Sequence, residues 1–137
     1  MHITSLPSPY GIGTFGTKAE KFVDWLVSAG QEYWQVLPMG PTGYWDSPYQ
    51  PFSTFAGNPL LIDLDDLVRM GLIPQLLCDN ADYGADPSVV DYENVTRTKM
   101  QLLNKAYSAF EENVGYVAFV KNVEYWLEDY SLFMALK

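Results

Sequence analysis

The sequence predicts an α/β fold, because two segments of strand length flank one amphipathic helix near its start. Residues 2–6 fit a short strand, and residues 33–37 form an apolar run that Pro38 ends. The segment between them has the apolar spacing of a helix with one buried face. A strand, a helix and a strand within about 37 residues form a βαβ unit with parallel strands and a right-handed crossover.

The helix of this unit is expected to begin at Thr17 and to end before Gly30. Thr17 and Glu20 have the spacing of a capping box, in which the threonine hydroxyl accepts an amide hydrogen bond and the glutamate reaches back. Gly30 suits the left-handed position that often follows a helix. The residues expected to form the buried face are Ala19, Phe22, Val23, Leu26 and Val27.

A long segment without helix or strand periodicity occupies residues 38–62. Prolines and glycines interrupt it throughout, and a segment of this length is usually functional or disordered. Five aromatic side chains argue against disorder, because they need something to pack on. They are Tyr44, Trp45, Tyr49, Phe52 and Phe55. The segment leaves the C-terminal end of the second predicted strand, where open sheets and α/β barrels bind their ligands.

The second half of the sequence predicts helices. A short helix over residues 65–70 follows a group of aspartates and ends at Gly71. Two longer helices, over residues 93–113 and from residue 117 to the end, are separated by Gly115 and are expected to form an antiparallel hairpin. The residues expected on the apolar stripe of the first are Leu103, Ala106, Tyr107, Phe110 and Val114.

The composition excludes several classes of function. Seventeen acids against eight bases give a net charge of −9, which disfavours nucleic acids and anionic lipids as partners. Five of these acids, with no base among them, fall in residues 79–93 and predict a solvated loop. The sequence has no apolar run of the roughly 18 residues that a membrane helix needs. The single cysteine, Cys78, permits no intrachain disulfide, so we expect a cytoplasmic protein.

The aromatic part of residues 38–62 has the chemistry of a sugar-binding surface. Tyr44, Trp45 and Tyr49 offer flat faces on which pyranose rings stack, and Asp46 and Ser47 offer hydrogen bonds to sugar hydroxyls. The prolines limit the freedom that the segment would lose on binding. The alternative, which composition alone favours, is that the aromatic residues form a small core beneath a long loop.

No other motif predicts a catalytic or metal site. His2 and one distant cysteine do not make a zinc signature, and Asp63 with its neighbours lacks the frame of a calcium loop. Residues 11–16 match the glycine spacing of a dinucleotide loop, but they follow two prolines, and no acidic residue closes a second strand. Asp46 is the only acid in the aromatic segment, so glycoside chemistry finds no second carboxyl group nearby. We therefore expect no metal and no cofactor.

Several short motifs in the first half of the sequence resemble those of one family. They are residues 2–13 (HITSLPSPYGIG), 33–38 (YWQVLP), 40–44 (GPTGY), 46–50 (DSPYQ), 55–59 (FAGNP) and 61–63 (LID). In this order and density they resemble the N-terminal part of 4-α-glucanotransferase, or amylomaltase, of glycoside hydrolase family 77. The resemblance covers about residues 2–66, and residues 67–137 fit the family's helical insertion more loosely.

The resemblance implies the N-terminal portion of a (β/α)8 TIM barrel with a mostly helical insertion. Residues 1–66 would be the first βαβ portion, with residues 38–62 as the substrate-binding loop, and residues 67–137 the insertion subdomain. The implied reaction is retaining transfer of α-1,4-glucan segments between maltooligosaccharide donors and acceptors, with an Asp nucleophile and a Glu acid/base. The resemblance places these carboxylates beyond Lys137. No catalytic residue is therefore expected in the chain, which alone would be inactive.

The resemblance also implies roles for five substrate-binding residues. Tyr49 matches the tyrosine that stacks on the sugar at the cleavage point, and Ser47 and Asp46 match residues that line the same subsite and brace the loop. Tyr44 and Tyr92 match two tyrosines of an outer glucan groove.

Trp45 departs from the family pattern, which has a glycine there, and its bulk would shift the loop or add a stacking face. The first predicted strand has no residues ahead of it, and the last helix has no stop signal before Lys137. We therefore expect a segment of a longer protein whose remainder completes the barrel. Two other functions fit the same residues: a non-catalytic glucan-binding remnant, and an interaction protein whose aromatic stripe on residues 117–136 docks a partner helix.

Overall fold

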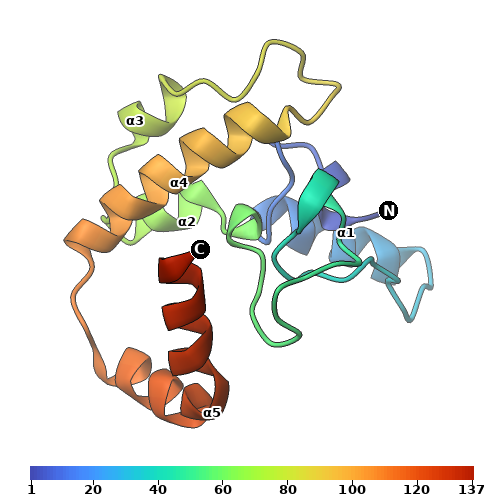
Figure 1. Ribbon diagram of the computed structural model, residues 1–137. Coiled ribbons are helices and arrows are strands. Elements are labelled where there is room, and N and C mark those ends of the chain that lie inside the picture. Colours follow the sequence, from blue (N-terminus) through green and yellow to red (C-terminus); the bar gives the residue numbers. More distant parts are fainter.

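The fold of residues 1–137 is shown in Figure 1 by a computed structural model, which describes all of them except the side chain of Tyr44. Its α-helices are α1 (Thr17–Ser28), α2 (Leu64–Arg69), α3 (Gln75–Asp79), α4 (Tyr92–Ala109) and α5 (Val114–Leu136). Three short 3₁₀ turns are η1 (Ile3–Ser5), η2 (Tyr44–Asp46) and η3 (Pro59–Leu61). The backbone of this part of the chain contains no β-strand, so the prediction of two strands is wrong for these residues.

The two predicted strands lie close together without forming a sheet. Residues 3–5 of the first form η1, and among the described residues no backbone hydrogen bond joins residues 33–37 to another segment. Side chains make the contact instead: Trp34 and Val36 pack against a cluster around Ile3, and the Trp34 indole N–H donates to the Met1 carbonyl at 2.8 Å. A strand exists only where a neighbour completes its hydrogen-bond ladder, and the described residues supply none for this one.

Helix α1 confirms the predicted helix but not its cap. Gly16 is the N-cap, with no side-chain hydrogen bond, and Thr17 is the first helical residue, so the capping box is wrong. Gly16 lets the Asp63 carboxylate lie against the start of α1, because a Cβ at position 16 would meet that carboxylate. Gly30 has φ +71° and confirms the predicted end. Of the expected buried face only Ala19 is fully buried.

The largest buried cluster lies between the loop at Tyr10 and helices α2, α3 and α4. Its members are Tyr10, Leu64, Ile73, Cys78, Leu102 and Ala106. The Tyr10 hydroxyl donates to the Asp65 carboxylate and accepts from the Gln75 amide at 3.1 Å. Burial, with the Asp65 carboxylate, raises the pKa of Tyr10 to about 12. Asp63 caps α2 by accepting the Asp66 N–H at 3.2 Å, in line with the predicted acidic start of this helix.

Helix α4 buries a different face from the one its apolar residues predict. Its buried residues are Val95, Thr98, Lys99, Leu102 and Ala106. Only Ala106 belongs to the expected stripe, and Tyr107 is exposed. The face is set by the partners, since α4 packs on η3 at one end and on the cluster at α2 and α3 further along. That face includes a lysine, which apolar periodicity cannot select.

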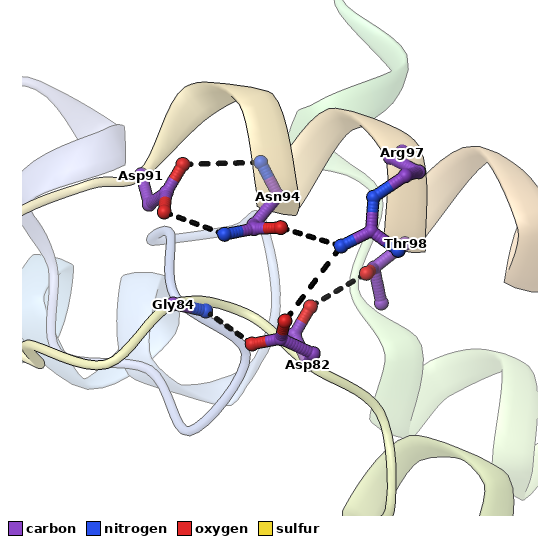
Figure 2. A network of polar contacts seen from close by, with 6 residues as sticks. All are labelled: Asp82, Gly84, Asp91, Asn94, Arg97 and Thr98. Atoms are coloured by element: carbon purple, nitrogen blue, oxygen red, sulfur yellow. Dashed lines mark hydrogen bonds and ion pairs between the residues drawn. The ribbon is translucent and has the colours of Figure 1, made fainter.

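The acidic segment before α4 is attached to that helix by polar contacts (Figure 2). The Asp82 backbone carbonyl accepts from the Thr98 hydroxyl at 2.5 Å, and its carboxylate lies 3.7 Å from the Arg97 guanidinium. Asp91 caps α4 by accepting the Asn94 N–H at 3.1 Å. The expected solvated loop is therefore anchored, and its first residue, Asp79, ends α3, a helix that the sequence did not predict.

Helix α5 does not pack along α4 as the predicted hairpin. Figure 1 shows the two helices leaving their short connection in different directions. None of the residues of α5 is buried, although most are apolar or aromatic. Its aromatic contacts include Phe52 and Phe55 of the long loop, and Phe110 just before the helix. None of the helices among the described residues combines the length and apolarity of a membrane span.

Candidate functional site

Residues 38–62 form the long irregular segment that the sequence predicts, and we call it the aromatic loop. Its two ends are joined where the Asn58 N–H donates to the Met39 carbonyl at 2.8 Å. The Asn58 side chain also accepts the Leu60 N–H at 2.9 Å and caps η3. The loop is therefore closed at a neck formed by Met39 and Asn58, and its last residues form the short turn η3.

The first half of the aromatic loop presents its described aromatic side chains to solvent. Trp45 is 96% exposed and Tyr49 is 69% exposed. The Tyr49 N–H donates to the Ser47 hydroxyl at 3.4 Å, so Ser47 braces the turn that carries the tyrosine. Tyr44, the remaining tyrosine predicted here, has a side chain outside the described residues.

Trp45 and Asp46 have left-handed backbones, with φ +61° and +53°. This region is unfavourable for a residue with a Cβ, and for a bulky side chain it costs roughly 1–2 kcal/mol. The family glycine expected at position 45 would adopt it without strain. Trp45 is therefore an exposed residue with a strained backbone, and it offers an aromatic face to solvent.

Asp46 and Tyr92, far apart in sequence, line one cavity of about 170 Å³. Tyr92 is the first residue of α4, and Asp46 is the last residue of η2. The lining residues also include His2, Thr4 and Asn58, so the cavity is polar on several sides. Tyr49 and Ser47 do not line it. The structure thus brings together two of the five predicted site residues and places two others beside them on the loop.

His2 is a residue of this cavity that the sequence analysis set aside. Its Nδ1 atom is buried and has no hydrogen-bond partner among the described residues. Burial and the charge of the amino terminus lower the pKa of His2, which favours the neutral imidazole. A neutral imidazole can donate from one nitrogen and accept at the other, as a sugar hydroxyl requires. The sequence feature that could have identified His2 as a site residue was its position at one end of the first predicted strand.

The second half of the aromatic loop packs against α5. Phe55 stacks on Trp126 at 5.7 Å between ring centroids and meets Tyr125 edge to face at 5.6 Å. The ring centroids of Phe52 and Phe133 lie 6.1 Å apart. Aromatic residues of this half therefore contact one another, as the alternative prediction requires, but Phe52 and Phe55 are 37% and 59% exposed and form no buried core.

The glycines of the dinucleotide-like motif make close contacts with other segments. A Cβ on Gly13 would lie 2.0 Å from the Ile3 carbonyl, and one on Gly11 would lie 2.8 Å from Tyr83 and Val95. Close packing therefore accounts for the spacing of these glycines. No group of three potential metal ligands lies together in the part of the chain that the structure describes.

Comparison with known proteins gives one consistent result. A family model described as 4-alpha-glucanotransferase matches residues 1–137. The chain is 48% identical over 139 residues to a 4-alpha-glucanotransferase of Clostridium butyricum and 48% identical over 143 residues to that of Thermus thermophilus. Each match covers 100% of this chain and 28% of the relative, so the chain spans less than a third of the length of these relatives.

A solved structure agrees with the sequence comparisons. The chain is similar to an amylomaltase of Streptococcus agalactiae, which was solved in complex with acarbose, with a TM-score of 0.91 and 44% identity. The match covers 100% of this chain and 28% of that one. The helices and the aromatic loop thus have the arrangement found in part of a larger protein.

Proposed function

The chain belongs to the 4-alpha-glucanotransferase family, glycoside hydrolase family 77, and on that premise we propose that the protein carrying it transfers α-1,4-glucan segments between maltooligosaccharides. The observation that carries the proposal is the match of the family over all of residues 1–137, together with an exposed aromatic loop beside a polar cavity. The solved relative holds acarbose, a ligand that resembles a sugar.

The residues of this chain would bind and orient sugar. Tyr49 is 69% exposed, and its ring would stack on a pyranose at the cleavage point. Ser47 holds the backbone of that tyrosine, and Asp46 with Tyr92 would contact glucan from the neighbouring cavity. Tyr44 is proposed for the outer groove with Tyr92.

The covalent chemistry would be supplied by the part of the protein that this chain does not span. A retaining transfer breaks the donor's glycosidic bond, forms a glycosyl ester on an Asp and passes the sugar to an acceptor hydroxyl, with a Glu moving the proton. We place both carboxylates outside residues 1–137, as the resemblance to the family implies. Residues 1–66 would then belong to a TIM barrel and residues 67–137 to a helical insertion, in a cytoplasmic protein.

The test is a transfer assay on the full-length protein. Maltotriose as the only substrate should give glucose together with longer maltooligosaccharides, with no net gain in reducing ends. Tyr49→Ala should lower kcat/KM by about tenfold or more, mainly through kcat, because stacking near the oxocarbenium-like centre strengthens in the transition state. Binding of maltotriose without transfer would instead support a glucan-binding remnant, and no binding would support the interaction protein.

A further inference from the structure

We propose that Lys99 of α4 is a positioning residue for sugar binding: its ammonium group holds the carbonyls of Leu60 and Ile62, where the aromatic loop rejoins the helices. Lys99 contacts neither the exposed aromatic residues nor the cavity, so it would act through the loop. The proposal rests on the proposed function for the role of that loop. It goes beyond it by assigning a residue of the helical half to the site.

The geometry around Lys99 is that of a buried clamp. The side chain is fully buried, and Nζ donates to the Leu60 and Ile62 carbonyls at 2.7 Å each. The Leu61 carbonyl between them accepts from the Phe15 N–H at 2.9 Å. Three successive carbonyls that no strand or long helix satisfies are thus held from two sides.

These contacts lead to both ends of the aromatic loop. The Leu60 N–H donates to the Asn58 side chain, and the Asn58 N–H in turn donates to the Met39 carbonyl at the neck. On the other side, Tyr92 lies two turns before Lys99 on the same helix and lines the cavity with Asp46. Lys99 therefore fixes both the neck of the loop and the placement of Tyr92 opposite Asp46.

Burying an ammonium group at this position costs free energy, so the hydrogen bonds that Lys99 donates must contribute to the structure. Its neighbours on the buried face of α4 include Val95 and Leu102, so an aliphatic side chain at position 99 would suit these surroundings. Burial lowers the pKa of Lys99 to about 8, and the Asp63 carboxylate offsets only part of that effect. An apolar replacement would avoid the buried charge but would leave two carbonyls without donors.

The experiment compares Lys99→Met with Lys105→Met in the full-length protein. Methionine keeps the length of the side chain and removes its donors, and Lys105 is an exposed lysine of the same helix. Hydrogen exchange should become about tenfold faster at the amides of Asn58, Leu60 and Leu61 in Lys99→Met only. This measurement needs no activity, so it stands even if the transfer assay on the parent protein fails.

Kinetics supply the second measurement. Lys99→Met should lower kcat/KM for maltotriose by about tenfold, since small misplacements of binding groups have effects of this size or larger. Combined with Tyr49→Ala, the loss should be smaller than the product of the two single losses, because both changes act on the same stacking contact. Lys99→Gln, which keeps one short donor, should fall between wild type and Lys99→Met, and it decides the matter if Lys99→Met does not fold.

The proposal is overturned if the Lys99 variants melt at a lower temperature while loop exchange and kcat/KM stay at wild-type values. Strictly multiplicative losses with Tyr49→Ala would also overturn it. Either outcome would make Lys99 a residue of the fold alone.

Discussion

Helices α4 and α5 are the two long helices of the chain, and they differ in a way their composition does not suggest. Helix α5 has 23 residues, is the more apolar of the two and buries none of them. Helix α4 has 18 residues, is more polar, and buries five, one of which is a lysine. Burial here follows the presence of a partner surface rather than the apolarity of the helix.

The partner surfaces explain the difference. Helix α4 lies on η3 and on the cluster formed with α2 and α3, so one complete face is covered. Helix α5 is held mainly by aromatic contacts, to Phe52 and Phe55 of the aromatic loop and to Phe110, and the Lys137 ammonium after its last turn lies 3.2 Å from the Phe52 ring centroid. Many of its apolar side chains, such as Val114 and Leu136, stay exposed.

The largest expected effect concerns the association of the 137-residue chain by itself. Large exposed apolar surfaces promote self-association, and Val117 and Leu136 are prominent on α5. We expect sedimentation velocity to show dimers or larger species at micromolar concentration, and the double variant Val117→Lys/Leu136→Lys to shift them to monomer. Gln101→Lys, on the exposed face of α4, should change nothing. A wild-type chain that stays monomeric would contradict the prediction that the exposed apolar surface of α5 causes self-association.

Replacement of one leucine by alanine in each helix should lower the free energy of unfolding by very different amounts. In the lysine-substituted monomer, Leu102→Ala should lower the free energy of unfolding by about 2–4 kcal/mol, because Leu102 is 7% exposed in the main cluster. Leu132→Ala, at a position 61% exposed, should change it by less than about 0.5 kcal/mol. Urea unfolding measures both, and equal losses would contradict the difference in burial.

The pH dependence of stability should report on the buried lysine of α4. The pKa of Lys99 is 10.5 in a model peptide and about 8 in the fold, so the unfolded state binds more protons between these values. Stability should therefore rise from pH 8 to pH 10, by about 2 kcal/mol from this group. Above pH 10 the raised pKa of Tyr10 and Tyr83 acts in the opposite direction.

The control for this titration is Lys99→Met, whose unfolding free energy should lack the rise attributed to Lys99 between pH 8 and pH 10. Urea midpoints at half-unit pH intervals give the comparison. A rise of the same size in both proteins would assign it to another group.

The smallest expected difference is at the two helix caps. Asp91 accepts the Asn94 N–H at 3.1 Å, and Asn113 accepts the Tyr116 N–H at 3.0 Å, so the caps are alike. Asp91→Ala should lower the melting temperature of the full-length protein by about 2–4 °C, because α4 is part of the core. Asn113→Ala should shift it by less than about 1 °C and should mainly increase exchange in the first turn of α5. Equal shifts would mean that the start of α5 is as tightly coupled to the fold as that of α4.

The sequence predicted the features whose signals are local. Gly30 and Gly71 ended their helices with positive φ, and Asp63 capped α2. The irregular character of residues 38–62 also followed from their prolines and glycines. The family motifs in the first half were confirmed by the match over the whole chain.

What the sequence by itself determined is therefore where α1 and α2 end, that acidic residues begin α2, where the aromatic loop lies and which family the chain belongs to. The tertiary structure alone decided that residues 33–37 form no strand, that Lys99 is buried on α4 while α5 is not, and that Asp46 meets Tyr92 in one cavity. Caps and glycines act within a few residues, so a local pattern reveals them. Burial, sheet pairing and convergence depend on partners far away in sequence, and periodicity carries no information on which partner is present.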